Sequence, residues 1–163
     1  MRAFAAGALL AALAACTHAD RVPAAGLCTA AETTYFACQT TKSRWISLCA
    51  TPSRSLQYRF GTPAKAELRY PPDPASGSAG FLFAHYFRFQ TDRTEVTFRN
   101  QGVEYAVFDY SEDRTRRAGV RVTSAEGKDT ELVCSGGVTS RLPELEGVLK
   151  CDADNALNGG GCR

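Results

Sequence analysis

The stretch LQYRFGTPAKAELRY, residues 56–70, decides the fold class of this chain. In residues 56–60, and again in residues 66–70, apolar side chains alternate strictly with polar or charged ones. Successive side chains of a strand point to opposite faces, so this period of two predicts two half-buried strands. The connection between them contains Gly61 and Pro63, which are turn-forming residues. The stretch therefore predicts two strands joined by a short turn.

The same signal continues more weakly along the rest of the chain. Residues 94–98 alternate less strictly, and residues 103–108 are apolar enough for a strand that is covered on both faces. The short connections between such segments contain Pro, Gly or Glu-Gly-Lys-Asp turn chemistry. We therefore predict nine strands, at residues 33–40, 43–49, 55–61, 64–70, 81–89, 93–100, 102–110, 117–124 and 129–135.

The predicted strands make up an all-β domain over residues 33–163. No segment within residues 33–135 shows an apolar stripe with a period of 3.6, so helical crossovers between parallel strands are not expected. An antiparallel meander is the simplest topology, and a closed barrel or a two-sheet sandwich would each hide its edges. The sequence favours neither of these two. A short helix is expected only in residues 142–149, packed against one end of the domain.

An apolar run at the N-terminus is typical of an export signal. Arg2 precedes residues 3–15, which carry no polar side chain. These thirteen residues are too few to span a membrane, which takes ~20, but their length and small final residues fit a secretory leader. We therefore predict that residues 1–15 are a signal peptide and that the protein is exported.

The leader ends in a motif that bears on membrane attachment. Leu13-Ala14-Ala15-Cys16 resembles the bacterial lipobox, at which the leader is removed and the cysteine is acylated. The resemblance implies a lipid on Cys16, and the small, polar residues 16–32 would then form a tether from the membrane. Thr17 in place of Asp after the cysteine implies, by resemblance to sorted Gram-negative lipoproteins, the outer membrane facing the periplasm. Cleavage after Ala19 would instead leave a secreted or periplasmic protein without an anchor.

The number of cysteines also indicates export. The chain has seven, and an odd number in a secreted protein leaves one thiol to be explained. Setting Cys16 aside leaves six, which can close three disulfides in an oxidising compartment. Cleavage after Ala19 would leave the same six. The even number of remaining cysteines therefore supports export but does not decide between the two cleavage sites.

The strand pattern narrows the disulfide pairing. A hairpin of residues 33–40 and 43–49 would place Cys49 at the same end as Cys28. Cys38 would lie near the turn of that hairpin, within reach of the last strand if that strand pairs beside the first. The expected pairs are Cys28 with Cys49, Cys38 with Cys134, and Cys151 with Cys162 in a closed C-terminal loop.

Composition and motifs argue against an enzyme. Without Arg2 the chain has 18 basic and 17 acidic side chains, and this balance does not favour nucleic acid as a partner. The only histidines are His18 and His85, so no HExxH zinc motif exists, and GxSxG and P-loop motifs are absent. Disulfide-bonded cysteines would leave no thiolate nucleophile. We expect no catalytic residue, no metal and no cofactor.

Two neighbouring segments are the candidates for a binding site. PPDPASGSAG, residues 71–80, cannot join a ladder or build a core, so it predicts a ten-residue loop on a rigid sheet. A tolerated insertion is the alternative. In FLFAHYFRF, residues 81–89, every second side chain is Phe or His. We interpret this as an aromatic core stripe, and the alternative is an aromatic groove able to stack on a sugar or a peptide.

A family resemblance adds to these candidates. Residues 75–77, Ala-Ser-Gly, with Phe81 downstream, resemble the loop with which small periplasmic or lipid-anchored β-barrel inhibitors of lysozyme plug the enzyme's cleft. Residues 36–38 and 45–49 resemble the opening strands of the same family. The resemblance implies that Ser76 and Gly77 bind a partner. We predict in addition that Phe81 and His85 support the base of the loop. The stretches LQYRFG, DRTEVTF and TSRLPELEGV are similar to a group of uncharacterised proteobacterial lipoproteins and secreted proteins.

We therefore expect an exported, lipid-anchored, non-enzymatic binding protein of the cell envelope. Its partner would be another envelope protein, and the leading hypothesis is an inhibitor or immunity protein for a peptidoglycan hydrolase. The alternative is a structural or accessory envelope lipoprotein. Binding of a small molecule or sugar by the aromatic face is a third hypothesis.

Overall fold

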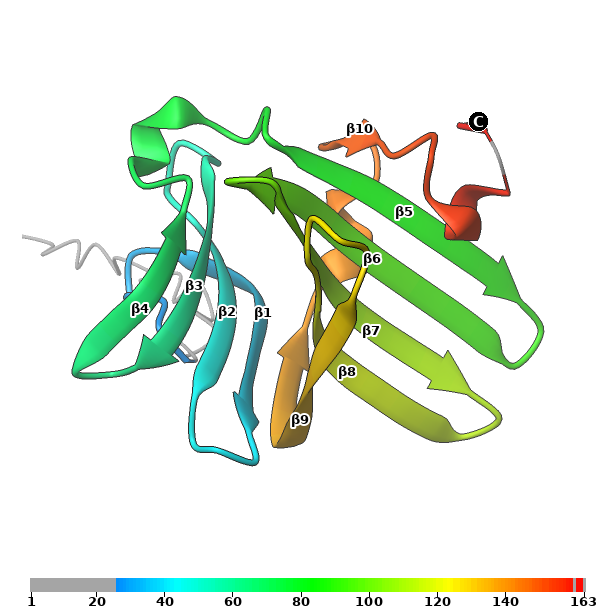
Figure 1. Cartoon of the computed structure of the whole chain (residues 1–163), viewed down its shortest axis with the longest axis horizontal. Coiled ribbons are helices and arrows are strands. Elements are labelled where there is room, and N and C mark those ends of the chain that lie inside the picture. The colour runs from blue at the N-terminus through cyan, green and yellow to red at the C-terminus, as the bar shows by residue number, and fades with distance from the viewer. Residues whose placement is uncertain (1–25, 160, 163) are drawn as a thin grey trace, which may run out of the picture.

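A computed structural model of the chain describes residues 26–159, 161 and 162, so the predicted signal peptide and Cys16 lie outside the described residues. Ten strands form one sheet in the order β10-β5-β6-β7-β8-β9-β1-β2-β3-β4 (Figure 1). They are β1 (Thr33–Thr40), β2 (Trp45–Ala50), β3 (Leu56–Thr62), β4 (Lys65–Tyr70), β5 (Phe81–Arg88), β6 (Thr91–Asn100), β7 (Val103–Glu112), β8 (Thr115–Thr123), β9 (Asp129–Ser140) and β10 (Lys150–Cys151). The connections contain the 3-10 turns η1 (Pro74–Ser76), η2 (Leu142–Leu145) and η3 (Ala156–Asn158).

The sheet curls into a half-barrel, with β1 to β4 on one side, β5 to β8 on the other and β9 between them (Figure 1). Every ladder is antiparallel except that of the two-residue β10, which runs parallel to β5. The predicted all-β, antiparallel fold class is confirmed, and β10 is an additional strand. Within the described range no ladder joins β4 to β5, so the two ends of the sheet stay unpaired with each other.

The core fills the concave face of the half-barrel. Alternate residues of a strand share a face, so each strand sends every second side chain inward. The buried core includes Phe36, Ile46, Leu48, Tyr58, Phe81, Phe98, Val107 and Val120. Burial of each such side chain contributes ~1.5–3 kcal/mol, so one core holds the two sides of the sheet together.

The segment after β9 closes one end of this core. Leu142 and Leu145 of η2 are buried between β1 and β6. The short helix expected in residues 142–149 is only this single 3-10 turn. Glu146 adopts an extended ψ of 131° and Gly147 a positive φ of 71°, so the backbone leaves the helical region directly after η2.

Three disulfides join cysteines on neighbouring segments. The pairs are Cys28–Cys49, Cys38–Cys134 and Cys151–Cys162, with Cα atoms 5.5, 5.7 and 5.9 Å apart. These separations lie within the usual range for a disulfide. The pairs are the three that the predicted hairpin register favours. Cys38–Cys134 links the first strand to the last long strand, so it fastens the two sides of the half-barrel at their junction.

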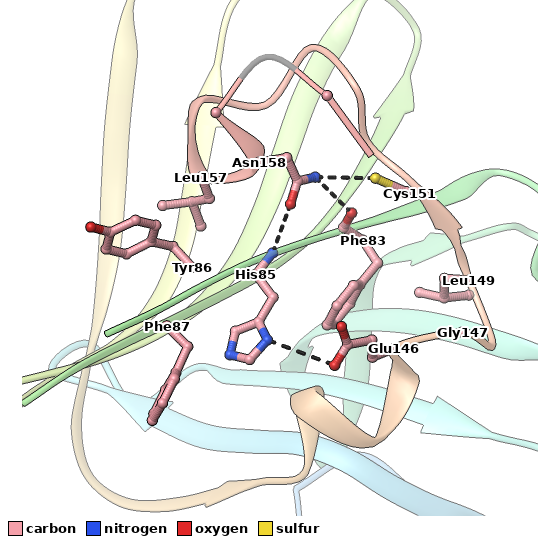
Figure 2. Close-up of a pocket in the computed structure, with 12 residues that line it drawn as sticks. Phe83, His85, Tyr86, Phe87, Glu146, Gly147, Leu149, Cys151, Leu157 and Asn158 are labelled. Atoms are coloured by element: carbon pink, nitrogen blue, oxygen red, sulfur yellow. Dashed lines mark hydrogen bonds and ion pairs between the residues drawn. The ribbon is translucent and has the colours of Figure 1, made fainter. Parts of the chain in front are cut away.

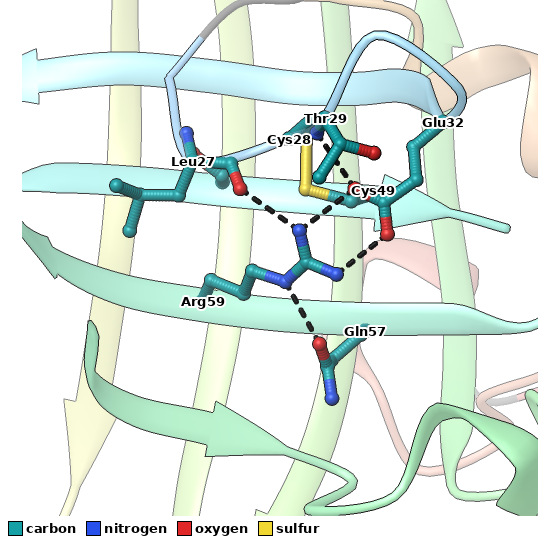
Figure 3. The surroundings of a disulfide bond; sticks show 8 residues. Leu27, Cys28, Thr29, Glu32, Cys49, Gln57 and Arg59 are labelled. Atoms are coloured by element: carbon teal, nitrogen blue, oxygen red, sulfur yellow. Dashed lines mark hydrogen bonds and ion pairs between the residues drawn. A yellow bond between two sulfur atoms is a disulfide. The ribbon is translucent and has the colours of Figure 1, made fainter. Parts of the chain in front are cut away.

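A short N-terminal segment covers the outer face of β1 to β3 (Figure 3). These are residues 26–32 of the expected tether, fastened by Cys28–Cys49 and by a hydrogen bond of 2.9 Å from Leu27 N to Ser47 Oγ. The alternation in β3 suggested that Arg59 faces solvent, but this segment covers it. β3 is therefore covered on both faces.

The covered Arg59 is fully paired. Its Nη2 lies 2.6 Å from Glu32 Oε1, and its Nη1 donates to Glu32 Oε2 and to Leu27 O at 2.8 Å each. Its Nε donates to Gln57 Oε1 at 2.8 Å (Figure 3). The two side chains of the ion pair are only 8% and 9% exposed. A buried charge of this kind is tolerated because each of the three guanidinium nitrogens donates to an acceptor and Glu32 neutralises the charge.

Candidate functional site

The loop of residues 71–80 is fixed to the sheet at both ends. Near its start, Gln57 Nε2 donates to Pro71 O at 2.8 Å. Near its end, Ser78 Oγ accepts from Leu56 N at 3.0 Å and donates to Arg54 O at 3.2 Å. The predicted loop therefore exists, and hydrogen bonds to the chain around β3 hold it in place.

The middle of this loop is ordered but exposed. Asp73 Oδ1 accepts from Ala75 N at 2.9 Å and so caps the turn η1. Ser76 is exposed, and among the described residues no hydrogen bond engages its hydroxyl. Gly77 has a φ of 78°, a conformation in which a larger side chain would be strained. Figure 1 shows this segment standing beyond the ends of β3 and β4.

Phe81 lies at the base of the loop, as predicted, but inside the core. It is almost fully buried, and its ring contacts Tyr70 and Phe98 edge-on at centroid distances of 5.5 and 5.4 Å. Tyr70 also stacks on Phe98 at 4.5 Å. Phe81 therefore acts by packing under the loop and presents no surface to a partner.

His85 lies elsewhere. It is four residues further along β5, a distance of roughly 13 Å in an extended strand, and it lines a cavity of about 500 Å³ (Figure 2). No residue of the loop 71–80 lines this cavity. The structure therefore places Ser76 and Gly77 in the exposed loop, Phe81 in the core after it, and His85 in a second, separate site.

The cavity lies along the exposed edge of β5. Asn158 holds the C-terminal loop against this edge: its Oδ1 accepts from His85 N at 3.2 Å, and its Nδ2 donates to Phe83 O at 3.3 Å (Figure 2). The same Nδ2 also donates to Asp152 O at 2.7 Å. Asp152 N donates to Phe83 O at 2.8 Å. The C-terminal loop thus satisfies the strand edge, and its residues form one wall of the cavity.

Two carboxylates flank the His85 ring. Nε2 lies 3.0 Å from Asp92 Oδ1, and Nδ1 lies 3.8 Å from Glu146 Oε2. Asp92 comes from the facing strand β6, whereas Glu146 comes from the segment after η2. One imidazole between two acidic groups makes this end of the cavity polar and negatively charged.

Exposed aromatic rings border the same site. Phe83 is buried, but further along the strand Phe87 is 72% exposed and Phe89 86%. The predicted aromatic core stripe therefore holds for the first half of residues 81–89 only. Figure 1 shows the β5–β6 hairpin extending away from β1 to β4, which agrees with the exposure of Phe87 and Phe89.

A smaller hollow of about 220 Å³ adjoins the site on the concave face. Asp92 lines it together with Asp109, Ser111 and Arg116. Arg116 forms two hydrogen bonds of 2.8 Å to Asp109, so its charge is neutralised locally. Among the described residues that line this hollow, no free basic side chain therefore offsets Asp92.

The residues that sequence reasoning missed here are Asp92, Glu146 and Asn158. The pairing of β5 with β6 places Thr94 opposite His85 and Asp92 opposite Phe87, so the hairpin register could have indicated Asp92. Glu146 reaches the site through a change in chain direction after η2, for which the sequence gives no local signal. Asn158, in a glycine-rich segment, is likewise placed only by the tertiary fold.

A second ionisable cluster lies on the outer face of the sheet. Glu95 is buried there, accepts from Arg121 Nη2 and Asn155 Nδ2 at 2.7 Å each, and also accepts from the Tyr110 hydroxyl. Burial, together with the hydrogen bond to Glu95, raises the pKa of Tyr110 to about 12. Every partner of this carboxylate is a donor, so the cluster is a satisfied structural network that also fastens the C-terminal loop.

In the part of the chain that the structure describes, no three His, Cys, Asp or Glu residues are grouped to hold a metal ion. The same part contains no helix long and apolar enough to cross a membrane. Comparison of the chain with protein-family models, with curated proteins and with solved structures finds no match.

Proposed function

We propose that this protein is an exported, non-enzymatic binding protein that inserts the loop 71–80 into the cleft of a cell-wall hydrolase, as an inhibitor or immunity protein. One observation carries the proposal. The loop is held at both ends by side-chain hydrogen bonds, while Ser76 in its middle is exposed and unpaired among the described residues.

Such a loop is suited to enter a cleft. A flexible segment loses conformational freedom when it binds, and this loss reduces affinity. Ser78 and Gln57 hold the loop before any partner arrives, so less freedom is lost. The Ser76 hydroxyl and the backbone next to Gly77 can then donate and accept hydrogen bonds in a polar active site.

The cysteines support the proposed location. Three disulfides are compatible with an extracellular or periplasmic compartment, since cytosolic thiols stay reduced. We propose in addition that Cys16 carries a lipid that anchors the protein to the outer membrane. If so, Cys16→Ser abolishes metabolic labelling with palmitate and moves the protein to the soluble fraction. Equal labelling of both forms contradicts the anchor.

A second candidate function is that of a structural or accessory envelope lipoprotein. Phe87 and Phe89 favour it, because exposed large apolar side chains close together commonly mark a protein-binding surface. In this case the protein would bind an envelope partner through the tip of the β5–β6 hairpin and leave cell-wall hydrolases unaffected.

Two serines of the loop provide a matched test. Ser76→Ala removes the exposed hydroxyl and should leave thermal stability unchanged. Ser78→Ala removes the hydrogen bonds to Leu56 N and Arg54 O and should lower the free energy of unfolding by ~1 kcal/mol. Replacement of residues 75–77 by three glycines keeps Asp73 and Ser78 and should weaken hydrolase binding by at least ~1.4 kcal/mol, a tenfold loss.

The assay is inhibition of a panel of lysozymes and lytic transglycosylases by the purified protein. Full activity of every enzyme at micromolar excess of the protein rejects the inhibitor function. Envelope binding that is lost in a Phe87→Ala Phe89→Ala variant and unchanged in the triple-glycine variant would then support the accessory function.

A further inference from the structure

The cavity beside His85 is separate from the loop 71–80 and carries its own inference. We propose that it binds a small organic amine, with the ammonium group next to Glu146 and the apolar part of the ligand against Phe87. This site goes beyond the proposed inhibitory function and does not depend on it.

The charges that face the cavity favour a cation. Glu146 is a rim carboxylate whose side chain is 69% exposed, and Asp92 lies behind the His85 ring at 3.0 Å. None of the described residues that line the cavity is Lys or Arg. The nearest arginine in the adjoining hollow, Arg116, is engaged by Asp109. An anionic ligand would therefore be repelled, whereas an ammonium group gains Glu146 as a direct partner and has the Asp92 carboxylate as a second negative charge nearby.

The aromatic side chains fit the same ligand class. The face of an aromatic ring attracts a cation within ~6 Å, and it also packs against an apolar ligand body. Phe87 exposes most of its ring and lies 6.5 Å from the His85 ring, centroid to centroid. A ligand with both a charge and an apolar body would cover this surface and contact the Glu146 carboxylate at once.

The cavity is built from rigid parts. Its walls are β5 on one side and the C-terminal loop on the other, and that loop is closed by Cys151–Cys162 and fastened by Asn158. The volume of about 500 Å³ lies within the range of ~300–1,000 Å³ that is usual for small-molecule sites. Little reorganisation is therefore needed for binding.

Three probes that share one ring test the proposal on the full chain. Benzylamine, benzyl alcohol and benzoate differ in charge, and their dissociation constants can be measured by NMR titration. We expect benzylamine to bind at least about fivefold more tightly than benzyl alcohol, and benzoate most weakly. The shifted resonances should include those of His85 and Phe87. Equal affinity for amine and alcohol would indicate a neutral, sugar-type site, and no shift with millimolar benzylamine would reject the site altogether.

Matched variants separate the charge from the fold. Glu146→Gln should weaken benzylamine binding at least about threefold and leave benzyl alcohol unaffected. Glu144→Gln is its control, because Glu144 is paired with Arg141 and does not line the cavity. Phe87→Ala should weaken both ligands, whereas Phe89→Ala, outside the lining, should weaken neither. An unchanged amine affinity in Glu146→Gln overturns the proposal.

Discussion

The two sides of the half-barrel are stabilised differently. On the side of β1 to β4, residues 26–32 cover the outer face, bury the pair Arg59–Glu32 and are fastened by Cys28–Cys49. On the side of β5 to β8 the hairpins are longer, and the outer face carries the solvent-accessible ion pairs Arg93–Glu112 and Arg99–Glu104 beside the buried Glu95. No disulfide joins the described strands β5 to β8 to one another.

This difference indicates where binding surfaces can form. On the side of β1 to β4 the outer face is covered and holds a buried charge, so this face tolerates little change. The surface that this side presents for binding is the loop 71–80. The second side extends its hairpins beyond the core and so leaves Phe87 and the His85 cavity accessible (Figure 1). Stability and accessibility are thus divided between two parts of one sheet.

The largest effect should come from the covalent link between the sides. Replacement of both Cys38 and Cys134 by serine removes a disulfide between residues 96 positions apart. The chain-entropy model predicts that this lowers the free energy of unfolding by ~4.7 kcal/mol. The equivalent loss for Cys151 and Cys162, only 11 positions apart, is ~3 kcal/mol. Urea unfolding of the two double-serine variants measures this difference. Equal losses of unfolding free energy in the two variants would show that loop entropy does not determine how much each disulfide stabilises the fold.

The second largest effect on stability should come from the buried ion pair Arg59–Glu32. Arg59→Met leaves the Glu32 carboxylate covered and without its main partner, which should cost ~3 kcal/mol of unfolding free energy. Adding Glu32→Gln to the same variant removes the stranded charge and should restore part of the loss. If the double variant is less stable than the single one, the buried charge is not the cause. Thermal and urea unfolding both report these changes.

The same pair predicts a pH dependence. Burial alone would raise the pKa of Glu32, but hydrogen bonds from Arg59 and from the Thr29 backbone N–H outweigh it and leave the pKa below its usual value. Glu32 therefore stabilises the fold above its unfolded pKa of ~4.3, and this contribution is lost as the pH falls through the lower folded pKa. The stability difference between the wild-type protein and Glu32→Gln should shrink as the pH is lowered. A constant difference contradicts this assignment.

The sequence predicted the strands well because they alternate over long stretches, as residues 56–60 do. It did not predict that Arg59 is buried, because the covering segment is small and polar and resembles a tether. Cys28 was the only signal that this segment returns to the sheet. The loop 71–80 was predicted from its prolines and glycines, whereas the His85 cavity depends on Glu146 and Asn158, which only the tertiary fold brings to β5.

A moderate effect is expected where the C-terminal loop meets the second side. Asn155 donates to the buried Glu95 and caps η3 by accepting from Leu157 N at 2.9 Å. Asn155→Ala should lower the unfolding free energy by ~2 kcal/mol. Asn155→Asp keeps the cap but brings a second carboxylate to Glu95, so it should be less stable than the alanine variant. The reverse order would mean that the cap, and not Glu95, holds the loop.

The smallest effect should come from the exposed counterpart of the buried pair. Arg99 and Glu104 face each other across β6 and β7 with Nη2 and Oε2 2.8 Å apart, but Arg99 is 79% exposed. Water and salt screen such a pair, so a double-mutant cycle to alanine should give a coupling of at most ~0.5 kcal/mol. The same cycle on Arg59 and Glu32 should give several times more. Because the two pairs match in distance and chemistry, equal couplings would mean that burial is not what distinguishes the two sides of the half-barrel.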